Sequence, residues 1–174
     1  MSNTTITAAD SITPSVSFTP SEPALKITGQ FILEMHDLEG NLVESRQMQN
    51  LITSAGKAAI AGLVGNTGAV TAFTYLAVGI GTTAAAIGDT ALQSEITDTG
   101  LARAAATVSR QTTTVTNDTL QLTYTWTATG AKAVTELGAL NAASSGVLLG
   151  RQVFSAINTS NGFGLTLTYK FQFS

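Results

Sequence analysis

Two stretches of this chain alternate strictly between apolar and polar side chains, and this pattern constrains the fold more than any other feature. From Leu120 to Ala128 every second residue is apolar, and the residues between them are threonine or glutamine. Leu165 to Phe173 repeats the pattern. Because side chains on a β-strand point alternately to its two faces, each stretch predicts a strand with one face in a core. Trp126 lies on the apolar face, so we predict that it packs in the core and does not form a ligand platform.

Other segments predict further strands, which are short and separated by turns. Phe73–Ile80 is apolar on both faces, which predicts a central strand with protein on each side, ending in the hinge Gly79-Ile80-Gly81. The remaining predicted strands are residues 25–36, 42–47, 103–115, 134–140 and 147–157. Regular spacing of short strands and turns is typical of a sandwich or barrel. We therefore predict an all-β fold: an antiparallel β-sandwich, jelly-roll-like, with one short helix and an extended N-terminal arm.

The segment from Asn50 to Asn66 predicts the short helix. Thr53 or Ser54 can cap its start, and Gly65-Asn66 ends it. Its expected apolar stripe consists of small residues with two leucines: Leu51, Ala55, Ala58, Ala59 and Leu63. Such a helix can lie close against a sheet and cover one end or face of the sandwich.

Residues 1–24 form the predicted arm, and residues 25–174 the predicted sandwich domain. The arm is rich in Ser and Thr and contains all 3 prolines of the chain, which favours an extended backbone. Its apolar residues are too sparse to build a core, so we expect them to bind a partner: Ile6, Ile12, Val16 and Phe18.

Composition excludes several classes of function. The chain has no cysteine, which rules out disulfide scaffolds and thiolate chemistry. Only 11% of its residues are charged, against about 25% in a typical soluble domain, which suggests a surface covered by partners or neighbouring copies. No basic cluster is present, so we expect no nucleic-acid binding. No apolar stretch approaches the roughly 20 residues of a membrane helix, and no signal peptide is visible, so we expect neither membrane insertion nor export.

The sequence shows no constellation of catalytic residues. His36 is the single histidine, and beside the turn at Asp37 we expect it to be an exposed strand residue. Aromatic residues make up 6% of the chain, too few to line a typical sugar-binding groove. We therefore predict no enzyme and no cofactor. The long connection 82–99 leaves one alternative open, a calcium site formed by Asp89, Glu95 and Asp98, although their spacing matches no known calcium loop.

Five runs in the chain resemble small virion structural proteins of tailed bacteriophages. The runs are residues 50–53, 73–83, 89–95, 135–146 and 149–154, and the likeness spans about residues 45–174. Proteins of this kind are β-sandwiches that serve as capsid decoration or cement proteins, or as parts of tails and fibres. The resemblance therefore implies a virion component made in the cytoplasm of a bacterial host.

Within that class we expect a capsid cement protein that bridges neighbouring capsid subunits. The length suits one domain, fibre-like repeats are missing, and the arm is suited to reaching a neighbour. The expected partners are the major capsid protein and copies of the chain itself, as a homotrimer. Two alternatives remain: a tail, collar or fibre-tip protein that binds a host glycan through the 82–99 loop, and a bacterial surface adhesin, which the missing export signal disfavours.

Overall fold

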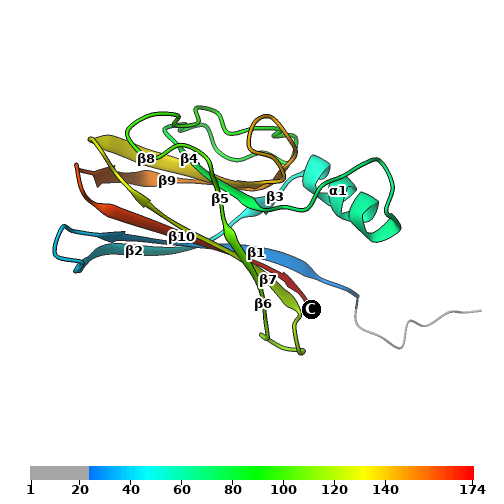
Figure 1. The fold of residues 1–174 in the computed structure, drawn as a ribbon. Helices are drawn as coiled ribbons and strands as arrows, with labels where there is room; N and C mark the ends of the chain where they lie inside the picture. Colours follow the sequence, from blue (N-terminus) through cyan, green and yellow to red (C-terminus); the bar gives the residue numbers. More distant parts are fainter. Residues whose placement is uncertain (1–23) are drawn as a thin grey trace, which may run out of the picture.

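The structure is a computed structural model and describes residues 24–174, which form two antiparallel sheets stacked face to face (Figure 1). The first sheet has the strand order β2, β1, β10, β7, β6, with bounds β1 Ile27–His36, β2 Leu42–Gln49, β6 Thr107–Gln111, β7 Thr119–Thr127 and β10 Gly164–Phe173. The second has the order β3, β9, β8, β4, β5, with bounds β3 Leu51–Ile52, β4 Tyr75–Gly79, β5 Ala104–Ala105, β8 Lys132–Leu140 and β9 Leu148–Thr159. The predicted all-β sandwich with one short helix is confirmed.

The alternating stretches form the centre of the first sheet. β10 lies between β1 and β7, and its register places Leu167 opposite both Leu33 and Tyr124. The inward side chains of these strands pack against the second sheet and form one continuous core. Trp126 is 2% exposed in that core, as predicted, and its indole Nε1 donates a hydrogen bond to the carbonyl oxygen of Ala102 at 2.7 Å.

β4 is buried on both faces, as the sequence predicted, but one face packs against the other sheet and the other face packs against a loop. Leu76 and Val78 point into the core between the sheets. Ala77 points the other way and packs against Leu92, which belongs to the long connection after β4. The outer face of the second sheet is thus covered by a loop.

One predicted strand is wrong. Residues 103–115 form two strands that belong to different sheets: β5 pairs with β4, and β6 pairs with β7 (Figure 1). The chain crosses between the sheets at Ala106, whose backbone N–H donates to the carbonyl of Thr74 at 2.8 Å. Three successive alanines precede Thr107, and side chains this small leave the alternation too weak to reveal the crossing.

The helix α1 (Ser54–Gly65) begins and ends where predicted. The hydroxyl of Thr53 accepts a hydrogen bond from the N–H of Gly56 at 2.9 Å, and Asn66 ends the helix in the left-handed conformation with φ 49°. The expected apolar stripe is only partly right, since Ala58 and Leu63 are exposed. The buried residues of α1 are Gly56 and Ala59, because the helix lies so close to β9 that a Cβ at Gly56 would collide with the backbone of Leu149.

Candidate functional site

A buried ion cluster lies beneath the loop that covers the second sheet. Glu136 on β8 is 0% exposed, and Nε of Arg151 on β9 donates to its Oε2 at 2.8 Å. Nη1 of Arg151 also donates to Oδ2 of Asp89, which lies in the loop, at 2.9 Å. Burial alone would raise the pKa of the Asp89 carboxyl, but hydrogen bonds from the N–H of Ala86 and from Arg151 outweigh it and lower that pKa.

Glu136 also binds the loop through its backbone. Its Oε1 accepts hydrogen bonds from the N–H groups of Gly81 at 3.0 Å and Ser94 at 2.6 Å, and its Oε2 accepts one from the N–H of Gln93 at 3.0 Å. Both carboxylate oxygens are therefore engaged, so Glu136 is placed to hold the loop and not to accept a proton from a substrate. Gly79 and Gly81 permit this approach, because a Cβ at either position would collide with Glu136.

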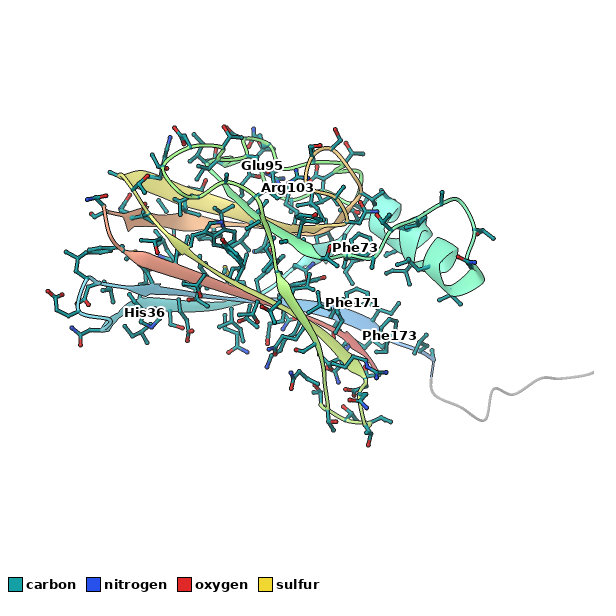
Figure 2. The ribbon with its side chains drawn as sticks, viewed as in Figure 1. His36, Phe73, Glu95, Arg103, Phe171 and Phe173 are labelled. Atoms are coloured by element: carbon teal, nitrogen blue, oxygen red, sulfur yellow. The ribbon has the colours of Figure 1, made fainter. Side chains whose placement is uncertain are left out.

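A second ion pair anchors the far end of the same loop. Arg103 donates through Nε and Nη2 to the two carboxylate oxygens of Glu95, at 2.8 and 2.5 Å (Figure 2). Its Nη1 donates to the carbonyl oxygens of Ala142 and Ser145, in the turn between β8 and β9. The guanidinium thus ties the loop to a turn from another part of the chain.

The three acids considered for calcium do not form a joint site. Asp89 pairs with Arg151, Glu95 with Arg103, and Asp98 with Lys132 at 2.9 Å. Within residues 24–174 no three potential metal ligands of the His, Cys, Asp and Glu types gather in one place. His36 ends β1 and is half-buried, at the end of the sandwich opposite Phe173 (Figure 2).

The outward face of the first sheet is rich in hydroxyl groups. Threonine hydroxyls on β7 and β10 pair across the strands, Thr123 with Thr168 at 3.3 Å and Thr125 with Thr166 at 2.8 Å. Such pairs are a favourable cross-strand combination and present neutral polar groups to the surroundings. They account for part of the low charge noted in the sequence.

An apolar groove opens at the end of the sandwich where α1 lies. It has a volume of about 270 Å³ and is lined by apolar residues from both sheets and the helix: Ile60, Leu63, Val64, Phe73, Leu120, Leu149, Phe171 and Phe173. In Figure 2, Phe73 on the upper side and Phe171 and Phe173 on the lower side mark this end. We call this feature the end groove.

The side chains at the rim of the end groove are exposed although they are apolar. Val64 is 85% exposed, Leu63 38% and Phe173 36%. Single exposed apolar residues are ordinary, but a contiguous group that lines a concavity marks an interaction site. The end groove is therefore the candidate functional site of the described part of the chain.

Sequence reasoning missed the end groove. The four residues expected to bind a partner (Ile6, Ile12, Val16 and Phe18) lie outside the described residues. The groove combines side chains from α1, β7, β9 and β10 with Phe73, and no local pattern connects these elements. A signal was present in Val64, which lies outside the expected apolar stripe of the helix.

The comparisons with known proteins identify no relative. No protein-family model matches the chain, and neither a curated protein nor a solved structure shows a significant match. Among the described residues, no helix has the length and apolar character that crossing a membrane requires.

Proposed function

We propose that this chain is a virion structural protein of a tailed bacteriophage, most specifically a capsid decoration or cement protein. In this role it would bridge neighbouring capsid subunits, with the major capsid protein and its own copies, arranged as a homotrimer, as partners. The body contributes a rigid sandwich, and the end groove and the arm contribute attachment. The proposal concerns a non-catalytic protein that works by burying surface between subunits.

The observation that carries the proposal is the spatial arrangement of the five runs that resemble phage virion proteins. These runs contain β3, β4, most of β8, the middle of β9 and the part of the loop that covers them. The ion cluster is built entirely from the same runs, since they contain Glu136, Arg151 and Asp89. The five runs therefore lie in one packed unit of the fold, the second sheet with the loop that covers it, and in this unit the proposal expects the likeness in fold.

The character of the described surface also supports an assembly role. The acids beneath the covering loop are engaged in ion pairs, and the outward face of the first sheet presents paired threonines. A surface with little charge tolerates close packing against neighbours, because few charged groups must lose water when the interface forms.

The number of copies per particle tests this proposal. A cement protein occupies sites repeated over the whole shell, so we expect hundreds of copies, distributed over the capsid surface in an image of labelled particles. Quantitative gel analysis of purified virions against the major capsid protein measures the ratio independently. A few copies at a single vertex would contradict the cement function.

A tail, collar or fibre-tip protein is the second candidate. The loop at residues 82–99 is held by hydrogen bonds from Gln93 and Ser94 to Glu136 and by the pair of Asp89 with Arg151, as a recognition surface would need to be. The loop contains no aromatic side chain on which a sugar ring could stack, which places this candidate second. Specific binding of the purified protein on a glycan array would favour it over cement.

A further inference from the structure

The chain enters its described body directly beside the end groove. Lys26 and Ser174 exchange backbone hydrogen bonds, with the N–H of Ser174 donating to the carbonyl of Lys26 at 2.8 Å. The next pair in the register is Ile27 with Phe173, and Phe173 lines the end groove. The 23 residues before Ala24 are therefore attached at the rim of an apolar concavity.

Those leading residues contain a regular apolar pattern of their own. From Ser11 to Ser21 every odd-numbered residue is Ser or Thr, and every even-numbered residue is apolar: Ile12, Pro14, Val16, Phe18 and Pro20. In an extended chain this period of two places all five apolar residues on one face. Ile6 has the same parity. The sequence thus predicts an extended segment with one apolar side. The end groove is lined by apolar side chains and can therefore bury that side.

The size of the end groove suits side chains of such a segment. Pockets that enclose small-molecule ligands occupy about 300 to 1,000 Å³. The end groove, at about 270 Å³ and lined only by apolar side chains, offers no polar group to orient a small molecule. It can take two apolar side chains, and Val16 and Phe18 are the pair separated by the single residue that an extended peptide requires.

The direction of β1 decides between the groove of the same molecule and that of a neighbour. β1 runs from Ile27, which lies opposite Phe173 at the groove end, toward His36 at the opposite end, so a segment that continued the line of β1 backwards would lead away from the body. Thr19 and Glu22 each precede a proline, which favours extended backbone. A return to the same groove would need a reversal within the few residues between Pro20 and the paired Lys26. An extended segment would instead hold Phe18 about 20 Å from Ala24, at roughly 3.3 Å per residue, within reach of an adjacent molecule.

We propose that Val16 and Phe18 of one copy occupy the end groove of a second copy of this chain. The proposal deepens the proposed function, on which it rests for the expectation that several copies lie side by side, and it names the partner of the arm. If each molecule donates one segment and accepts another, contacts of this kind would link the copies head to tail, in a closed ring where the rotation between neighbours closes.

Disulfide trapping in purified protein tests the proposal, because the chain has no cysteine of its own. One batch carries Val16→Cys, which keeps the aromatic anchor Phe18 and replaces valine by another small apolar side chain. A second batch carries Val64→Cys, at an exposed site where the substitution leaves the core intact. Mixing the two batches under mild oxidation should give a disulfide-linked dimer of one chain of each kind. The matched control replaces Val16→Cys by Ser17→Cys, which lies on the opposite face of the predicted extended segment and should link far less.

Two results would overturn the proposal. If the test and control cysteines in the leading segment gave equal yields of linked dimer, or neither gave any, the predicted apolar face of the segment would not be the one that enters the groove. A linkage that forms only within single molecules, in a chain that carries both Val16→Cys and Val64→Cys, would place the segment in its own groove.

Self-association provides a second measurement. We expect Val16→Asp with Phe18→Asp to weaken it by on the order of tenfold or more, as loss of a buried aromatic anchor does. Ser15→Asp with Ser17→Asp adds the same charge to the other face and should leave the sedimentation velocity profile unchanged. Equal effects of the two pairs would contradict the proposal. Since purified protein is used, failure here leaves the virion assignment open, and a wrong virion assignment would not affect these results.

Discussion

Glu136 carries a formal charge in the interior of the protein and is the residue on which the covering loop depends most. It accepts hydrogen bonds from three loop N–H groups and pairs with Arg151, so one side chain satisfies donors from three segments. A buried ion is costly unless it is paired and hydrogen-bonded, and both conditions hold for the carboxylate of Glu136.

Replacing Glu136 with glutamine should therefore destabilise the protein strongly. Glu136→Gln leaves the buried Arg151 with Asp89 as its remaining acidic partner. It also replaces one accepting oxygen by an NH₂ group, which cannot accept hydrogen bonds from the backbone N–H groups of the loop. We expect a loss of about 3 kcal/mol in the free energy of unfolding, measured by chemical denaturation. The control is Glu44→Gln, which breaks the more exposed pair with Arg46 and should cost less than about 1 kcal/mol. Similar losses for the two variants would refute the role assigned to Glu136.

The turn between β6 and β7 depends on the charge of Asp118. Its carboxylate accepts hydrogen bonds from the N–H groups of Val115, Thr114 and Thr113, and these bonds hold the pKa of Asp118 well below its usual range. A carboxyl whose pKa is lower in the folded than in the unfolded chain stabilises the fold above the unfolded value, which is about 3.9. That stabilisation is lost as the pH falls toward the folded pKa.

We therefore expect the thermal midpoint to fall on acidification from pH 7 to pH 3, and to fall less in Asp118→Asn. The variant lacks the titrating group, so the difference between the two curves reports the contribution of Asp118. Differential scanning calorimetry at both pH values measures it. Parallel curves for the two proteins would show that the turn does not depend on this charge.

At the scale of elements, the sequence predicted what is locally encoded. β7 and β10 follow from alternation alone, and α1 follows from Thr53 at its start and Asn66 at its end. The crossing at Ala106 was not predictable, because it depends on which sheet offers a free strand edge to each half of the segment. The end groove was not predictable for a similar reason, since its residues come from separate elements that meet only in the folded protein.

The close contact between α1 and β9 leads to a prediction that opposes helix propensity. Alanine is favoured over glycine inside a helix by about 0.5 to 1 kcal/mol, yet Gly56→Ala should destabilise the protein because the new Cβ meets the backbone of Leu149. Gly65→Ala, in the last turn of the same helix, has only ordinary contacts and should be neutral or stabilising. Urea denaturation of both variants measures the difference. A stabilised Gly56→Ala protein would mean that the helix lies farther from the sheet.

The whole molecule divides the tasks of folding and attachment between different residues. The described body contains a continuous core between two sheets and a loop fixed by Glu136 and Arg103. The end groove, an exposed apolar feature that joins the helix and both sheets, lies where the leading segment joins the body. Folding should thus depend little on residues 1–23, while assembly should depend on them strongly.

Removal of residues 1–23 tests this division most directly. The truncated and complete proteins are compared for their thermal midpoint and for binding to phage shells that lack the protein, measured by cosedimentation. We predict nearly equal midpoints and a large loss of shell binding in the truncated protein. Undiminished shell binding, or a midpoint that falls sharply on truncation, would contradict the account.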